Sequence, residues 1–294
     1  MATEATNGSS VLTISKRRDH VWRRFLRNRR AVVGAVVLIS FCLMALLAPA
    51  VAPYPAEHQR LVDRLQPPGP DHIMGTDGLG RDIFSRAIYA CRVSLPIGLA
   101  AMIVSMGVGV AIGLTAGYAG GTIDNILMRF TDLLLAFPIF FLLLTVTALF
   151  GRGIAVLILM LGLTSWGSTA RIMRGEVLAI KEQPYVEASR SVGAKDLWII
   201  LRTILPNAVA VILVAATLRV TLVILVEGGL SFLGLGVQAP TPSWGNMIAE
   251  GREFLRVAPW ITLFPGLFLF LCTMSFNLVG DGLRDAFDPR MIER

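Results

Sequence analysis

The sequence lacks the motifs of a chain that binds a nucleotide or hydrolyses a substrate. No GxxxxGK[ST] loop occurs, and none of the three lysines (Lys16, Lys181 and Lys195) follows a glycine, so a phosphate-cradling loop is excluded. HExxH, GxSxG and paired carboxylates at the end of an apolar run are also missing, which argues against a membrane-embedded hydrolase. We therefore expect no catalytic residue and no cofactor site in this chain.

Cysteine is scarce as well. Cys42, Cys91 and Cys272 are scattered and odd in number, with no CxxC and no His/Cys spacing. This excludes a disulfide framework and a cysteine-based metal site. We interpret the three as packing residues.

Charge is the third scarcity. Only 16% of the 294 residues are charged, 54% are hydrophobic and the mean hydropathy is +0.67, more apolar surface than a soluble domain can cover. The chain is therefore predicted to be an integral membrane protein. The net charge of +7 does not indicate a nucleic-acid partner, because eight basic residues crowd into 16–30, just before the first apolar run, where they set topology.

Apolar runs long enough to cross ~30 Å of hydrocarbon predict an all-α protein with six transmembrane helices. The basic segment 1–30 is expected in the cytoplasm, which places the loop 57–92 outside and the tail 281–294 inside, so both termini are cytoplasmic. Residues 171–202 carry six Lys or Arg, so they are also expected on the cytoplasmic side. The predicted spans are 31–56, 93–118, a third ending near 151, 154–170, 206–236 and 257–280.

The second span contains a regular set of glycines. Gly109, Gly113 and Gly117 recur at four-residue spacing, which places them on one helix face. Small residues at this spacing let two helix backbones approach closely in lipid. The pattern predicts a packing seam rather than a substrate site.

A charged hairpin, residues 184–203, lies between the fourth and fifth spans. Pro184 can start a short helix, Gly193 can end it in a left-handed cap, and 195–202 can form a second helix that joins the fifth span. The hairpin is suited to a groove on a partner protein, although it could instead fold back onto its own bundle. Its small residues are Ala188, Ser189 and Ala194, and its apolar anchors are Val186, Val192, Leu197 and Trp198.

The hairpin resembles the EAA loop of ABC-importer permeases. It reads Glu187-Ala188-Ser189, three residues, Gly193, nine residues and Thr203-Ile204-Leu205-Pro206, with Ser189 where alanine is usual and Thr203 where an aliphatic residue is usual. Three further segments extend the resemblance over nearly the whole chain. They indicate the second permease subunit of dipeptide and oligopeptide importers, a subfamily that includes nickel and glutathione carriers. They are His72-x-x-Gly75-Thr76-Asp77-x-x-Gly80-Arg81-Asp82-x-x-Ser85-Arg86, Glu227-Gly-Gly-Leu-Ser-Phe-Leu-Gly-Leu-Gly236 and Pro242-Ser243-Trp244-Gly245.

The resemblance implies a type I ABC-importer permease in a prokaryotic inner or plasma membrane, with a core of five helices (93–280) that includes the coupling hairpin. It further implies a homologous second permease, two cytoplasmic ATPase subunits that bind ATP and Mg²⁺, and an extracytoplasmic substrate-binding protein. Small peptides are the implied substrate, with nickel or glutathione as alternatives. The implied ATPase-docking residues are Tyr185, Glu187, Ala188, Ser189, Gly193, Ala194, Leu205 and Pro206.

Two charges in the fifth span are candidates for the translocation path. Arg219 lies 13 residues beyond Pro206, hence ~20 Å along the helix and close to mid-membrane. We favour a cavity-lining role over a structural ion pair, because an arginine there costs at least ~2.5 kcal/mol unless it meets water or a counter-charge. Glu227 is ~12 Å further along, too far for easy pairing with Arg219, at a glycine-rich helix end that is either an external gate or a loop junction.

On the outer side, Asp77, Arg81 and Asp82 can pair locally in a tight turn. Residues 82–92 form an amphipathic helix that can lie in the membrane interface. By resemblance, this surface and the 237–256 loop with Trp244 face the binding protein or form an external gate. Two other classes stay open: an ATP-independent secondary carrier, which should show inverted repeats, and a membrane scaffold.

Overall fold

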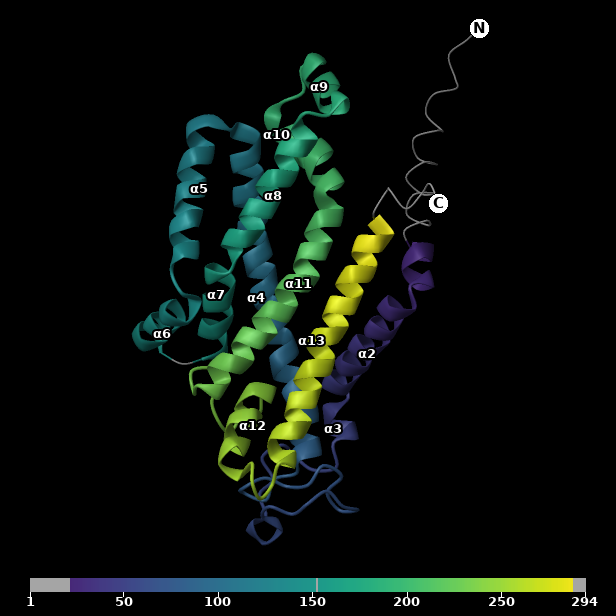
Figure 1. Cartoon of the computed structure of the whole chain (residues 1–294), viewed down its shortest axis with the longest axis vertical. Helices are drawn as coiled ribbons and strands as arrows, with labels where there is room; N and C mark the ends of the chain where they lie inside the picture. The colour runs from purple at the N-terminus through teal and green to yellow at the C-terminus, as the bar shows by residue number, and fades with distance from the viewer. Residues whose placement is uncertain (1–21, 152, 288–294) are drawn as a thin grey trace.

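The computed structural model describes residues 22–151 and 153–287, which form an elongated helical bundle (Figure 1). The described residues contain no β-strand beyond one isolated bridge between Thr76 and Asp82, so the predicted all-α class is confirmed. Most of the basic segment 1–30 and the last seven residues of the predicted tail lie outside the described residues. The elements are α2 (Arg29–Leu46), α3 (Ala48–Val51), η1 (Leu61–Asp63), α4 (Ile83–Ala119), α5 (Gly121–Ala136), α6 (Ile139–Phe150), α7 (Ile154–Thr164), α8 (Trp166–Lys181), α9 (Pro184–Ser191), α10 (Asp196–Ile199), η2 (Ile200–Ile204), α11 (Leu205–Phe232), α12 (Trp244–Gly251), η3 (Arg252–Phe254) and α13 (Trp260–Phe287).

Five helical stretches are long and apolar enough to cross a membrane, and a bent pair supplies a sixth if it counts as one span. The bent pair is α5 with α6, whose axes differ by 87°. Phe137 and Pro138 separate the two helices in extended conformation, because the proline ring excludes the helical region for the residue before it. The third predicted span is therefore broken in its middle. The five stretches are Arg29–Leu46, Ile83–Ala119, Ile154–Lys181, Asp196–Phe232 and Trp260–Phe287.

The glycine seam predicted in the second span is present, and its partner is α8. A Cβ on Gly109 would lie 2.6 Å from Thr169 Cβ, one on Gly113 2.6 Å from the carbonyl oxygen of Ala170, and one on Gly117 2.8 Å from Val177 Cβ. Real Cβ atoms do not come this close to a neighbour. The three glycines therefore bring α4 and α8 into backbone contact over two helical turns.

The two ends of the described chain pack together. Asn28 caps α2 and donates from Nδ2 to Asp285 near the end of α13, at 3.1 Å. Along the same pair, a Cβ on Gly34 would meet the Ser275 carbonyl oxygen at 2.9 Å. Both ends lie toward the part of the bundle from which α9 projects, opposite α12 and the long loop before α4 (Figure 1).

The first part of α4 differs from the prediction for 82–92. These residues form no separate interfacial helix, because α4 starts at Ile83 and runs unbroken to Ala119, capped by Asp82, whose side chain accepts from Ser85 N at 2.7 Å. Ile83 and Ile88 are buried, but so is Arg86 on the opposite, polar face. A helix covered on both faces has no polar side left to lie against lipid headgroups.

Candidate functional site

The hairpin 184–203 forms a finger, with two short helices that project beyond the bundle (Figure 1). Pro184 occupies the first position of α9, and Gly193 adopts the left-handed conformation at φ 80°, as predicted. From Asp196 the chain continues through α10 and the five-residue π-helical turn η2 directly into α11. The finger is therefore rigidly continuous with a long span on one side and joined to α8 by a short turn on the other.

One anchor fixes the finger to its own bundle. Val186 is fully buried, in a cluster with Val177 and Ile180 of α8 and Ile199 and Ile204 beyond the turn. The prediction that Val186 is an anchor for a partner is therefore wrong, because this side chain already fills the chain's own core. The alternative, a finger folded wholly onto the bundle, does not hold for the rest of the hairpin.

The other three predicted apolar anchors of the finger are exposed. Val192 is 84% exposed, Leu197 67% and Trp198 52%. Most of the predicted docking residues are accessible too: Tyr185, Glu187, Ala188, Gly193 and Pro206 are exposed, and Ser189 is half-buried. Ala194 and Leu205 are half-buried because they pack against the cluster around Val186. This surface, together with those three apolar side chains, is the docking face of the finger.

Tyr118, at the end of α4, ties the base of the finger to the bundle, and the sequence did not single it out. Its hydroxyl donates to Asp196 Oδ1 at 2.6 Å, and its ring lies 5.5 Å below the guanidinium of Arg190. Lys181 Nζ at the end of α8 donates to the Tyr118 carbonyl oxygen at 2.8 Å. The side chain of Tyr118 thus contacts α9 and α10, and its backbone carbonyl group contacts α8. No local motif marks such a residue, because its partners are 63 to 78 positions away.

Arg219 lies in the middle of α11 and points toward α8. Its Nη2 donates to the hydroxyls of Ser168 and of Thr169, the latter at 3.2 Å. No carboxylate among the described residues lies within ion-pair distance of it, so the structural ion pair weighed as an alternative does not form within that part of the chain. Its role in a translocation path stays a prediction.

Glu227 is 1% exposed and pairs with Ser231 rather than with Arg219. Ser231 Oγ donates to Oε1 at 2.7 Å and accepts from Val237 N at 3.1 Å, while the buried Oε2 has no partner among the described residues. Helix α12 packs directly here, since a Cβ on Gly245 would lie 2.7 Å from Gly228 Cα. The carboxylate is thus sealed at the junction of α11 and α12, which fits either the gate or the loop-junction reading.

The predicted turn that precedes α4 forms an ionic cluster with α4 and α12. Asp77 Oδ2 accepts from Arg81 Nε at 2.6 Å and from Arg86 Nη1 at 2.5 Å. Glu250 of α12 accepts from the same two arginines at 2.7 Å and 2.6 Å. Two positive and two negative charges therefore lock the loop, the start of α4 and α12 together. The roles of Arg86 and Glu250 were missed, because the sequence places them 164 positions apart.

The second carboxylate of the turn has a separate partner. Asp82 accepts from Ser85 N and hydrogen-bonds His72 Nδ1 at 3.0 Å. His72 is buried in this contact.

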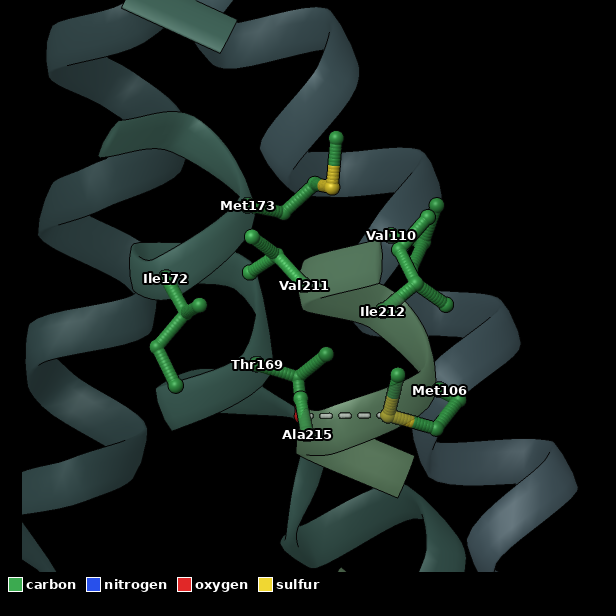
Figure 2. Close-up of a pocket in the computed structure, with 8 residues that line it drawn as sticks. All are labelled: Met106, Val110, Thr169, Ile172, Met173, Val211, Ile212 and Ala215. Carbon is green, nitrogen blue, oxygen red and sulfur yellow. Dashed lines mark hydrogen bonds between the residues drawn. The ribbon is translucent and has the colours of Figure 1, made fainter. Parts of the chain in front are cut away.

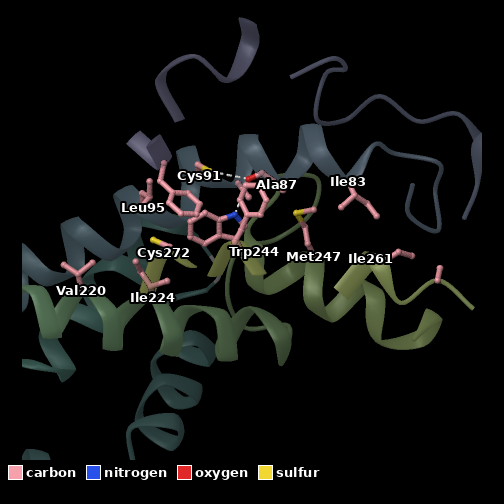
Figure 3. Close-up of a cluster of buried hydrophobic side chains, with 14 residues drawn as sticks. Ile83, Ala87, Cys91, Leu95, Val220, Ile224, Trp244, Met247, Ile261 and Cys272 are labelled. Carbon is pink, nitrogen blue, oxygen red and sulfur yellow. Dashed lines mark hydrogen bonds between the residues drawn. The ribbon is translucent and has the colours of Figure 1, made fainter. Parts of the chain in front are cut away.

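Trp244 belongs to the adjoining core (Figure 3). Its side chain is fully buried, its indole N–H donates to the Ala87 carbonyl oxygen at 3.2 Å, and its ring packs edge-on against Phe41. Helix α12 occupies part of the predicted 237–256 loop. The side chains of Ser243 and Asn246 cap its first turn reciprocally, and this local pair is the sequence signal that could have predicted the helix start.

The prediction that Asp77, Arg81, Asp82 and Trp244 contact a binding protein therefore has to be revised. All four side chains are buried at 6% exposure or less, with partners inside the chain. These four residues stabilise the packing at this end of the molecule. Their role in an external gate stays a prediction. The exposed apolar side chains here belong to other residues, such as Ile73 and Leu79.

Two family models match this chain, and together they cover residues 18–68 and 109–293. Residues 109–293, which include the finger and Arg219, match the family described as binding-protein-dependent transport system inner membrane component. The chain belongs to this family. Residues 18–68 match the N-terminal transmembrane domain of oligopeptide transport permease C, so the resemblance read from the four sequence segments is confirmed.

Relatives in this family match nearly end to end. The chain is 42% identical over 271 residues to the glutathione transport system permease protein GsiD of Pectobacterium atrosepticum, covering 92% of this chain and 90% of that protein. It is 40% identical to the oligopeptide transport system permease protein OppC of Bacillus subtilis over 98% of this chain and 95% of that protein. The dipeptide transport system permease protein DppC of the same organism is 42% identical, with 92% and 85% covered.

The fold also matches a solved transporter. A chain of the MetNI methionine ABC transporter in an inward-facing conformation superposes with a TM-score of 0.57 at 16% identity, covering 69% of this chain and 97% of that one. At this identity the match establishes the fold alone, that of a type I importer permease.

Proposed function

We propose that this chain is the translocation subunit of an ATP-driven importer of small peptides. It pairs with a second permease, docks cytoplasmic ATPase subunits through the finger and receives substrate from a binding protein on the opposite side. ATP and Mg²⁺ are bound by the ATPase subunits, and this chain performs no chemistry of its own. The curated relatives named for oligopeptide, dipeptide and glutathione transport support the substrate class.

The observation that carries the proposal is the docking face of the finger. Large apolar side chains on a charged helical hairpin, outside the bundle, are costly unless a partner covers them. The small residues beside them allow a close approach, as for a helix seated in a groove. The continuity of α10, η2 and α11 gives movement of the finger a direct route into the bundle.

The cycle that follows is mechanical. ATP-driven approach of two ATPases displaces the finger, and α11 moves with it relative to the α4–α8 pair that the glycine seam holds together. This is a rigid-body rearrangement, which turns access from one side of the membrane to the other.

The test uses the complex in proteoliposomes with all its subunits. We expect uptake of labelled di- and tripeptides that requires hydrolysable ATP and the binding protein. Val192→Asp on the finger should remove ATPase co-purification, since it places a charge in the docking face. The matched control is Val62→Asp, at a valine 89% exposed at the opposite end, which should leave ATPase association unchanged. Equal ATPase retention in both variants would refute finger docking.

The other candidate functions have separate outcomes in the same assay. Uptake of glutathione in preference to unmodified peptides would assign the chain to glutathione import, which the 42% identity to GsiD also supports. Preference for nickel would assign a metal carrier. Uptake without ATPase subunits would indicate a secondary carrier, and partner binding without any uptake a scaffold.

A further inference from the structure

Arg219 differs from four other arginines of the bundle in having no negative partner among the residues that the structure describes. Arg81 and Arg86 share Asp77 and Glu250, Arg171 pairs with Asp132, and Arg174 pairs with Asp124. These four cations are each neutralised by a carboxylate within the described residues. Arg219 instead donates to two neutral hydroxyls, on Ser168 and Thr169.

This arrangement leaves a positive charge ready to accept an anion. An arginine at mid-membrane depth is costly unless it meets water or a counter-charge, and hydroxyl groups supply no charge. They do hold the guanidinium in one direction, because both acceptors lie on consecutive residues of α8. The N–H groups on Nε and Nη1 make no hydrogen bond within the described residues, so either can donate a single charge-assisted hydrogen bond to a carboxylate oxygen.

An apolar groove begins beside the guanidinium. Thr169, which accepts from Arg219, also lines this groove, and Ala215 lies one helical turn before Arg219 on the same face of α11. Figure 2 shows its side chains converging from α4, α8 and α11. Its free volume is about 10 Å³, room for one water molecule and far below the ~300–1,000 Å³ of a ligand pocket, so it takes no substrate side chain. The other lining residues are Met106, Val110, Ile172, Met173, Val211 and Ile212.

We propose that Arg219, Ser168 and Thr169 form a binding station for the terminal carboxylate of the transported peptide. The proposal rests on the peptide-import function and names the substrate group that the path recognises. It also separates the substrate candidates by charge. Peptides and glutathione carry a free carboxylate, whereas a nickel cation is repelled by an unpaired guanidinium.

The decisive comparison is between substrates that differ only in this charge. Uptake of Ala-Ala-Leu and of Ala-Ala-Leu-amide is measured in the reconstituted complex, for the wild type, Arg219→Gln and Arg219→Lys. A charged hydrogen-bonded pair predicts about tenfold or more preference for the free acid in the wild type. The preference should vanish in Arg219→Gln and persist in part in Arg219→Lys. The matched control is Arg171→Gln, which removes an exposed arginine of α8 and should keep the preference.

A second measurement does not depend on transport. N-acetyl-leucine should raise the melting temperature of the purified complex more than N-acetyl-leucinamide does, and this difference should disappear in Arg219→Gln. Wild-type stabilisation by acid and amide alike would overturn the proposal, as would an unchanged acid preference in Arg219→Gln. Loss of assembly in Arg219→Gln, with acid preference kept in the remaining complex, would instead identify an ion pair with another subunit. Absence of all peptide uptake with acid-specific stabilisation intact would refute the import function and leave the carboxylate station standing.

Discussion

A single methyl group on Gly113 should separate α4 from α8. In Gly113→Ala the new Cβ would lie 2.6 Å from the Ala170 carbonyl oxygen, 2.6 Å from Met173 Cβ and 3.0 Å from the backbone nitrogen of Arg174. Ordinary van der Waals contact begins at 3.4 Å, so the helices must move apart by about 0.8 Å. Two of these three atoms are backbone and cannot rotate out of the way.

The expected magnitude follows from overpacking. Forcing an extra methyl group into a closely packed interface costs about 1–3 kcal/mol. Gly107 provides the matched control on the same helix, because a Cβ there meets nothing within 4 Å. Gly107→Ala should be neutral or stabilising by up to ~1 kcal/mol, since alanine is the better helix former.

Thermal unfolding of the purified complex in detergent distinguishes the two variants. We expect the apparent melting temperature of Gly113→Ala to fall below that of Gly107→Ala by on the order of 5 °C. Scan rates must be equal, because unfolding of a membrane complex is irreversible and its midpoint is kinetic. Equal midpoints for the two variants would show that α4 and α8 are not held by backbone contact, and the rigid pair invoked in the transport cycle would have to be abandoned.

Three further changes test other parts of the bundle. Tyr118→Phe removes the 2.6 Å hydrogen bond to Asp196, worth about 1–3 kcal/mol with a charged acceptor, and should lower the number of peptides imported per ATP hydrolysed while assembly stays intact. In Gly193→Ala the new Cβ meets no atom within 4 Å, but the backbone keeps φ 80°, which costs an alanine roughly 1–2 kcal/mol. This strain should weaken ATPase co-purification, and Gly193→Asn should weaken it less. Glu250→Ala leaves two arginines with only Asp77 and should lower the melting temperature more than Glu250→Gln, which keeps an acceptor; equal midpoints would contradict the clamp.

Several features that depend on local chemistry were predicted correctly. Apolar length predicted the spans, the spacing of Gly109 and Gly113 predicted a helix contact, and Pro184 with Gly193 predicted the two ends of α9. The bend at Pro138 was equally local, but it was not predicted, because apolar residues stand directly before and after the proline. Hydropathy measures apolarity and carries no information on the direction of a helix axis.

What the sequence could not supply is pairing across long separations. Arg86 looked like the polar face of an interfacial helix, yet it is buried because Glu250 neutralises it from α12. Val186 looked like an exposed anchor, yet it fills a core made by helices on either side. In both cases a single side chain has the same local pattern whether its partner is the chain itself, lipid or another protein.

Two parts of the described bundle are each continuous within themselves, and the candidate sites lie where these parts meet. The glycine seam fixes α4 to α8, while the finger helix α10, the π-helical turn η2 and α11 form one continuous stretch. The two parts pack through apolar side chains, as in the cluster that joins Ile199 and Ile204 to α8. Their polar contacts include the hydroxyl of Tyr118 on Asp196 near the finger, and Arg219 on Ser168 and Thr169. A displacement of the finger that breaks the first contact must also shift Arg219 against its two hydroxyls, because the same helix carries both groups. The affinity of the guanidinium for a carboxylate would then change at the moment the finger moves, which is what alternating binding and release of an anionic cargo requires.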